Sequence, residues 1–311
     1  MCVVLNYKEK RFLLCMHSLY SDILCTFVAA KSIPFSTTFK GRNGQNSSIK
    51  IELIGYDHKS KFNRNMKILV CISHVPDTTS KINFTDGDSK FDTNGVQFVI
   101  NPNDEFGLTR AMWFKEKQGA SVHVANVGGP ETEPTLRKAL AIGADEAIRV
   151  NTEATDGFSV AQQLAHIAKD GAYDLVIGGR ESIDYNGGMV PGMIANLIGA
   201  NFVNTCISLE VEGTSAKAIR EIDGGKETLS TSLPLVIGGQ KGLVEESDLR
   251  IPNMRGIMQA RSKPLHVKEA IDTVKETTTT GFEKPAPKGA VTLVDNVDDL
   301  INLLHNEAKV I

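Results

Sequence analysis

The residues with the clearest chemical potential form a glycine-rich run from Gly179 to Gly188, which contains Arg180, Ser182 and Asp184. An apolar segment typical of a buried strand precedes the run, and a segment with helical periodicity follows it. Backbone N–H groups and the positive dipole end at such a helix N-terminus can bind a phosphate. A carboxylate there can accept from a ribose hydroxyl or order the loop. The run is either a phosphate-binding loop or an ordinary connection whose glycines serve turns, and its local sequence favours neither.

The usual signatures of catalytic and metal sites are missing from the sequence. It contains no GxGxxG after a strand, no GxxxxGK[ST] phosphate loop, no HExxH and no GxSxG. Its seven histidines have no ligand spacing, so no metal site is expected.

From Met66 onward, apolar runs alternate with helical patterns. Asn101 and Ser159 are expected to cap two of the helices. Strands separated by helices in this way predict right-handed crossovers and a doubly wound, parallel α/β sheet. Ligands bind at the carboxyl ends of the strands in such sheets, so the loops after Ile72, Val127 and Ile177 are expected to meet at one edge. The strands are expected at 67–72, 122–127, 147–150 and 174–178.

After Ala200 the pattern changes to short strands, which predict an appended β-hairpin region. Pro252 and Gly256 interrupt the polar segment 243–261, which is expected to be an exposed loop. Threonines and prolines in 275–288 predict an extended arm, and a short terminal helix is expected at 295–304. The short strands are expected at 206–211, 216–222, 228–233 and 235–238.

Charge divides the 311-residue chain into two parts. Residues 1–65 carry ten Lys and Arg against four Asp and Glu, whereas the remainder has an excess of nine acids. An acidic body without a basic stripe argues against nucleic acid as a partner. No segment reads as a membrane span. The cysteines have no disulfide framework, so the protein is expected to be intracellular: cytoplasmic, or in the mitochondrial matrix of a eukaryote.

Three regions follow from these patterns. Residues 1–65 are expected to be an N-terminal extension without a role in function, either disordered or an artefact of start-site assignment. Residues 66–264 are expected to form an α/β domain, and residues 265–311 a C-terminal arm and helix.

Five stretches of the body, in order along the chain, resemble the beta subunit of electron-transfer flavoproteins. The most specific is 218–237, which follows the family's spacing of Arg, Asp, Gly-Gly, Glu and Pro. The resemblance covers nearly the whole chain from Met66. The other four stretches are Val75-Pro-Asp, Ile100-Asn-Pro, 138–145, and 179–184 running into 188–197.

The resemblance implies a doubly wound, mostly parallel nucleotide-binding α/β domain of adenine-nucleotide-hydrolase-like or flavodoxin-like layering, with a β-hairpin region. The extended C-terminal arm would contact an alpha subunit. The chain would be an electron-carrier subunit and not an enzyme, in a heterodimer whose FAD lies in the alpha subunit or is shared at the interface. That FAD would accept electrons from acyl-CoA dehydrogenases of fatty acid β-oxidation, or from other dehydrogenases. It would pass them to a quinone oxidoreductase, and the beta subunit would hold AMP as a structural cofactor.

Matching the family's motifs residue by residue gives the expected sites. Dehydrogenases would dock on Ile251, Pro252 and Asn253, with Ile251 as the apolar anchor. Two positions depart from the family: Ser73 replaces a usual Lys, and Ile251 replaces a usual Leu. The first loses a charge, and the second alters the shape of the anchor. The AMP site would comprise Cys71, Asn101, Pro102, Asn103, Asp104, Gly128, Gly179, Arg180, Glu181, Ser182, Ile183, Asp184, Tyr185, Asn186, Gly187, Gly188, Met189 and Val190.

Three other interpretations stay open on the sequence. The electron-bifurcating type of the same family would hold a second FAD in this subunit, although the intact 220–225 motif and Pro252-Asn253 favour the AMP-holding type. An ATP-binding enzyme of the same fold, such as an ATP pyrophosphatase, would need a serine- and glycine-rich loop where residues 73–77 have no glycine. A nucleotide-binding stress-type protein would form a self-sufficient homodimer.

Overall fold

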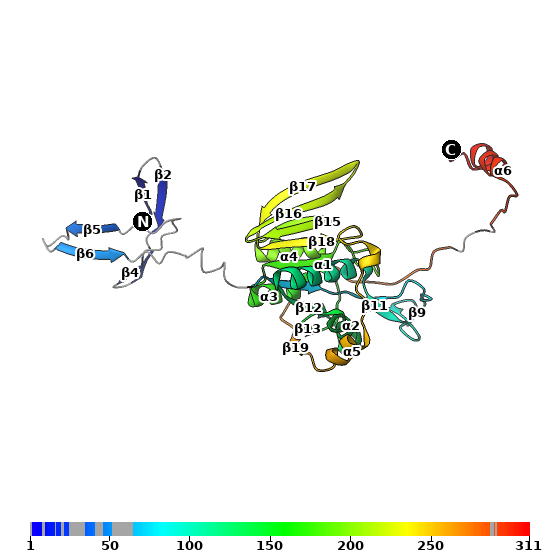
Figure 1. Ribbon diagram of the computed structural model, residues 1–311, viewed down its shortest axis with the longest axis horizontal. Coiled ribbons are helices and arrows are strands. Elements are labelled where there is room, and N and C mark those ends of the chain that lie inside the picture. The colour runs from blue at the N-terminus through cyan, green and yellow to red at the C-terminus, as the bar shows by residue number, and fades with distance from the viewer. Residues whose placement is uncertain are drawn as a thin grey trace. The chain divides into compact units, whose positions relative to one another are not determined.

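The computed structural model describes residues 65–286, 289 and 291–311 in full, and only backbone strands within residues 1–64. The chain divides into two units, Met1–Arg64 and Asn65–Ile311 (Figure 1). The prediction that the N-terminal extension has no role in function falls on residues 1–64, whose side chains lie outside the described residues. The strands of the first unit form three antiparallel pairs: β1 (Cys2–Tyr7) with β2 (Lys10–Cys15), β3 (His17–Leu19) with β4 (Asp22–Leu24), and β5 (Phe35–Lys40) with β6 (Asn46–Ile51).

A nine-stranded sheet forms the centre of the second unit, in the order β17-β16-β15-β18-β14-β7-β12-β13-β19. The neighbours from β15 to β19 in this order are parallel, and β15, β16 and β17 pair antiparallel. The chain winds outward from β7 in both directions, so the predicted doubly wound, mostly parallel sheet is confirmed. The strands are β7 (Lys67–Cys71), β12 (Ser121–Val127), β13 (Glu146–Asn151), β14 (Leu175–Gly179), β15 (Asn201–Glu212), β16 (Ser215–Ile222), β17 (Gly225–Ser232), β18 (Leu235–Gly239) and β19 (Leu265–Glu269).

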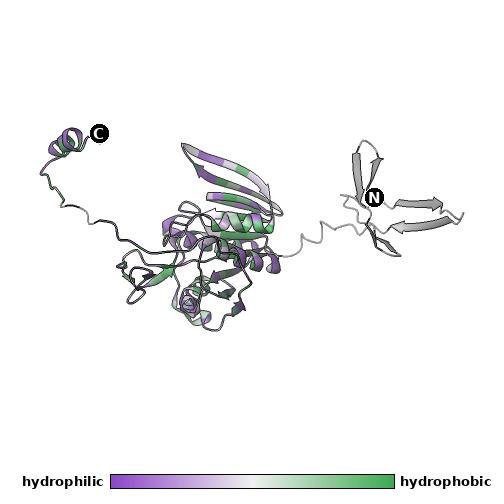
Figure 2. Cartoon of the chain, turned by 180° about the vertical axis from the view of Figure 1, so that it is seen from behind, coloured by the Kyte–Doolittle hydropathy of each residue, from purple (hydrophilic) through white to green (hydrophobic). Residues whose placement is uncertain are grey.

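Helices cover both faces of this sheet, as the apolar runs require. In β7, Ile68 and Val70 belong to the hydrophobic core under α1 (Pro102–Gln118) and α2 (Glu133–Ile142). Leu69 and Cys71 belong to the opposite core, under α3 (Gly157–Gly171) and α4 (Val190–Ile198). Successive side chains of a strand point to opposite faces, so a strand buried on both sides must be apolar throughout. Figure 2 shows this hydrophobic centre, with α4 mostly apolar and the β16-β17 hairpin mixed in character.

Shorter elements connect the sheet to its surroundings. A 3-10 turn η2 (Pro130–Thr132) precedes α2. No helix of the described residues is long and apolar enough to cross a bilayer. Two small antiparallel pairs follow β7: β8 (His74–Pro76) with β11 (Phe98–Ile100), and β9 (Phe84–Thr85) with β10 (Lys90–Phe91).

The segment 243–261, expected to be an exposed loop, is instead partly helical and partly buried. It contains the 3-10 turn η3 (Glu246–Asp248) and helix α5 (Met254–Ala260), and Leu243 and Val244 are buried. The reason is packing against α2. A Cβ on Gly256 would lie only 2.3 Å from the carbonyl oxygen of Ala141, so the missing side chain permits this close approach.

The C-terminal region also differs in detail from the prediction. Its first residues form β19, which pairs in parallel with β13 and extends the sheet past residue 264. The described residues of 275–288 have no helix or strand, as expected for an arm. The terminal helix consists of α6 (Val297–Asn302) followed by a π-helical turn, η4 (Leu303–Ala308).

Candidate functional site

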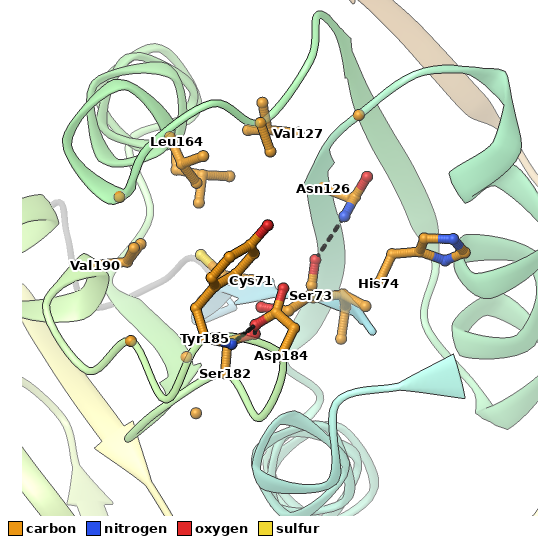
Figure 3. Close-up of a pocket in the computed structure, with 18 of the residues that line it drawn as sticks. Cys71, Ser73, His74, Asn126, Val127, Leu164, Ser182, Asp184, Tyr185 and Val190 are labelled. Carbon is orange, nitrogen blue, oxygen red and sulfur yellow. Dashed lines mark hydrogen bonds between the residues drawn. The ribbon is translucent and has the colours of Figure 1, made fainter. Parts of the chain in front are cut away.

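A cavity of about 620 Å³ opens at the carboxyl ends of the parallel strands (Figure 3). Residues from the ends of β7, β12 and β14 line it, as the sequence predicts for loops of a doubly wound sheet. The loop after β13 and the C-terminal arm line it as well. Its volume lies within the range of small-molecule sites, about 300 to 1,000 Å³.

Asp104, in the first turn of α1, joins the two central strand ends beneath the cavity. One carboxylate oxygen accepts from the N–H of Ser73 at 2.7 Å, and the other accepts from the N–H of Gly179 at 2.6 Å. Burial raises the pKa of Asp104 to about 7, even though these hydrogen bonds act in the opposite direction. Neighbouring side chains leave no room for a side chain at position 179, since a Cβ on Gly179 would lie 2.5 Å from the Asp104 carboxylate.

Asn101 holds the base of the glycine-rich loop. Its side-chain amide donates to the carbonyl of Glu181 at 2.9 Å, and its side-chain oxygen accepts from the N–H of Ile183 at 3.3 Å. Asn101 does occupy the N-cap position of α1, but its side chain makes no capping bond. The expected capping role is therefore wrong, because this fully buried side chain serves the distant loop. The neighbouring Asn103 donates to the same Glu181 carbonyl at 3.2 Å.

One part of the cavity wall is apolar. Val127, Leu164 and Ile194 line it together with Cys71. Burial, and then the charge of Asp104, raise the pKa of the Cys71 thiol far above its ordinary value, so the thiol stays protonated and unreactive. Asn126 donates to the carbonyl of Ile72 at 2.8 Å, whereas its buried side-chain oxygen has no partner among the described residues.

The structure separates the residues expected in the nucleotide site into three groups. Pro102 and Ile183 line a second, neighbouring cavity, and Asn101, Asn103, Arg180, Asn186 and Gly188 line neither. Asn101 and Asn103 support the loop from below. The expected residues that line the first cavity are Cys71, Asp104, Gly128, Gly179, Glu181, Ser182, Asp184, Tyr185, Gly187, Met189 and Val190.

Asp156 is a lining residue that the sequence reasoning missed. It accepts from the N–H of Ser159 at 2.7 Å and caps α3 in a reciprocal capping box, so the expected cap at Ser159 is wrong. Its other oxygen accepts from the N–H groups of Glu276 and Thr277 at 2.7 and 3.0 Å. Burial alone would raise the pKa of Asp156, but these hydrogen bonds outweigh it and lower the pKa to about 2.

Some of the missed lining residues could have been found from the sequence, and others could not. Glu153 and Asp156 follow β13, and the rule that ligands bind at strand ends would have found them. Thr277 and Thr279 lie in the arm, and nothing local in the sequence relates them to the cavity.

The charges around the cavity are negative. Six carboxylate side chains line it, and no Lys or Arg of the described residues does. Arg180 instead pairs with Glu181 at 2.8 Å. Binding of a phosphate would therefore depend on backbone N–H groups and on the helix N-termini of α3 and α4. The described residues contain no cluster of three or more His, Cys, Asp or Glu that could hold a metal ion. The six carboxylates belong to Asp104, Glu131, Glu153, Asp156, Glu181 and Asp184.

The expected docking residues lie together on a firmly held loop. Ile251 is 85% exposed, and Met254 and Met258 of α5 are exposed nearby in the sequence. Asn253 caps α5 by accepting from the N–H of Gly256 at 2.7 Å. Arg137 of α2 donates to the last carbonyl of α5, that of Ala260, at 2.7 Å. The exposed apolar side chains are thus presented by an ordered backbone.

Comparison with known proteins agrees with this architecture. Residues 88–273 match the model of the electron transfer flavoprotein domain. The chain is 36% identical over 262 residues to the electron transfer flavoprotein subunit beta of Bacillus subtilis, covering 79% of this chain and all of that protein. The subunit beta of Syntrophomonas wolfei is 34% identical over 228 residues, 73% of this chain and 88% of that protein. The subunit beta of Dictyostelium discoideum is 31% identical over 252 residues, 79% of this chain and 100% of that protein. The chain belongs to the electron transfer flavoprotein beta-subunit family.

Proposed function

We propose that this chain is the beta subunit of a heterodimeric electron-transfer flavoprotein and an electron carrier, not an enzyme. In this proposal it holds AMP structurally in the cavity of about 620 Å³ and docks dehydrogenases on the loop that carries Ile251. The FAD of the alpha subunit supplies the redox chemistry, accepting electrons from acyl-CoA or other dehydrogenases and passing them to a quinone oxidoreductase. The C-terminal arm and helix contact that alpha subunit.

The observation that carries the AMP assignment is the cavity of about 620 Å³ at the carboxyl ends of the strands, which combines apolar walls with a glycine-rich loop and the N-terminus of α4. A planar purine suits the apolar walls formed by Val127, Leu164 and Ile194. The carboxylates of Glu153 and Asp184 suit the hydroxyl groups of a ribose. The glycine-rich loop and the first turn of α4 would hold the phosphate through backbone N–H groups, in the absence of a lining cation.

Two features support a structural and not a catalytic role for the bound nucleotide. The thiol of Cys71 is held in its protonated form. Asp104 is fully engaged by the two backbone N–H groups of Ser73 and Gly179, so it organises the strand ends.

The docking assignment rests on an exposed apolar side chain, Ile251, carried by an ordered loop. Because Ile251 is 85% exposed, its burial by a partner removes a large apolar area from water and favours binding. The ordered loop reduces the conformational entropy lost on binding. Methionines such as Met254 and Met258 adapt to partner surfaces of different shape, as expected for a protein that serves several dehydrogenases.

Co-expression with the alpha subunit of the same source tests the proposal. The purified complex would be denatured, and its released nucleotides separated and counted per heterodimer. One FAD and one AMP are expected, together with reduction of the complex by an acyl-CoA dehydrogenase. Two FAD and no AMP would overturn the AMP assignment, and recovery of homodimers alone would overturn the electron-carrier assignment.

A further inference from the structure

A second cavity of about 1,140 Å³ adjoins the first and is lined by aromatic rings. Phe84, Phe91 and Phe98 come from the small strand pairs after β7, and Phe282 comes from the arm. Phe84 and Phe282 stack with centroids 4.9 Å apart. Such a lining suits a flat, apolar ring system.

The two cavities share four lining residues, namely His74, Glu131, Asp184 and Tyr185. His74 is fixed, because it stacks on Phe98 at 4.3 Å and hydrogen-bonds the hydroxyl of Thr135 at 2.8 Å. Glu131 accepts from the N–H of Gly129 at 2.9 Å. Tyr185 differs from both, since its side chain is a large ring and 68% of the residue is exposed.

The loop around Tyr185 holds this ring at the boundary between the cavities. Ser182 and Gly187 form an antiparallel bridge at the base of the loop. One oxygen of Asp184 accepts from the hydroxyl of Ser182 at 2.5 Å and from the N–H of Tyr185 at 2.9 Å. Figure 3 shows the ring of Tyr185 extending from this loop, which also carries Ser182 and Asp184.

We infer that Tyr185 restricts the first cavity to mononucleotides, by separating it from the aromatic cavity into which a longer nucleotide would extend. The inference rests on the proposed function, in which the first cavity holds AMP. A dinucleotide bound through its adenosine half would have to direct its second ring system out of the first cavity. The adjoining aromatic cavity is the apolar space for that ring, and the Tyr185 ring stands between them. The same ring can stack on a bound mononucleotide and retain it.

Replacing Tyr185 tests this separation in the complete heterodimer. Wild type, Tyr185→Ala and Tyr185→Phe would each be co-expressed with the alpha subunit and dialysed against mixtures of AMP and FAD. Released nucleotides would be counted after denaturation, the FAD of the alpha subunit being the first equivalent. In Tyr185→Ala, the ratio of the dissociation constants for FAD and AMP at the second site is expected to fall by about tenfold or more. Tyr185→Phe keeps the ring and should retain the wild-type ratio.

A matched control separates this effect from a general loosening of the region. Ile222 of β16 lines neither cavity and is exposed, so Ile222→Ala should leave the ratio unchanged. An unchanged ratio in Tyr185→Ala, while the wild type holds AMP, would overturn the inference and leave the proposed function standing. An equal fall in Ile222→Ala or Tyr185→Phe would overturn it too. A wild-type complex that already holds two FAD would overturn both the AMP assignment and the inference.

Discussion

The side chain of Asp104 accepts a hydrogen bond from the backbone N–H of Gly179 at 2.6 Å, across 75 residues of sequence. Because its other oxygen binds the N–H of Ser73, one buried carboxylate connects the carboxyl ends of β7 and β14. These strands flank the point where the sheet reverses its winding, which is where such folds bind ligands. Asp104 therefore fixes the floor of the candidate site before any ligand is present.

Asp104→Asn should change how stability depends on pH. In the folded protein burial raises the pKa of Asp104 to about 7, above its ordinary value of 3.8. The folded state thus binds this proton more tightly than the unfolded chain. Protonation of Asp104 therefore contributes to the free energy of unfolding fully below about pH 4, and this contribution is lost as the pH rises through about 7. Urea titrations of the wild type should show the free energy of unfolding falling over that window by on the order of a few kcal/mol, and Asp104→Asn should lack this component. Parallel pH profiles would contradict the prediction.

Gly179→Ala should be strongly destabilising, whereas Gly187→Ala in the same loop should be nearly neutral. The new Cβ at position 179 would lie 2.5 Å from the Asp104 carboxylate and 2.7 Å from the Cβ of Asn103, so the backbone must shift. At Gly187 nothing lies within 4 Å. The expected loss of unfolding free energy is about 1 to 3 kcal/mol for the first variant and within about 0.5 kcal/mol for the second. Equal losses would show that the space beside Asp104 does not matter.

Asn101→Ala should loosen the glycine-rich loop. The substitution leaves the N–H of Ile183 without its side-chain partner and the carbonyl of Glu181 with only the longer bond from Asn103, at a cost of about 1 to 3 kcal/mol. Amide hydrogen exchange at Ile183 should accelerate, while exchange within α1 should not, because Asn101 makes no capping bond. Asn103→Ala removes one longer hydrogen bond and serves as the milder control. Faster exchange confined to α1 would support a capping role instead.

Asp156→Ala should release the arm from the mouth of the candidate site. The aspartate caps α3 and binds the N–H groups of Glu276 and Thr277, so the variant loses a cap worth about 1 kcal/mol and both arm contacts. Hydrogen exchange at the amides of Glu276 and Thr277 should accelerate, because both amides lose their acceptor on Asp156. Ser159→Ala disturbs the capping box alone and should leave those two amides protected. Equal exchange in both variants would contradict the prediction.

Ile251→Ala should slow electron transfer from a dehydrogenase to the heterodimer. The residue is 85% exposed, so its truncation removes apolar contact area from a partner and not from the core. Steady-state reduction of the complex should show a raised KM for the dehydrogenase of about tenfold, with unchanged AMP content and heterodimer yield. Ile222→Ala alters an exposed apolar residue on the hairpin and should have no such effect. Loss of AMP in Ile251→Ala would show that the loop belongs to the nucleotide site.

The sequence by itself determined the parts of this protein that depend on local patterns. Strand β7 had to be buried on both faces because its residues are apolar without alternation. The order of strands and helices then determined that several loops meet at one edge, and the motif at 218–237 indicated the family. These conclusions need only the periodicity and spacing of neighbouring residues.

Only the tertiary structure decided which side chains build the site. Asn101 has the sequence context of a helix cap, yet its side chain binds residues 80 and 82 positions away. Asp156 reaches the arm 120 residues later, and β19 joins the sheet although sequence reasoning placed residues 265–311 in the arm and terminal helix. Each of these contacts joins segments that are distant along the chain, and a buried polar group must take whatever partner the folded chain brings to it. That partner depends on the whole arrangement, which no local pattern contains.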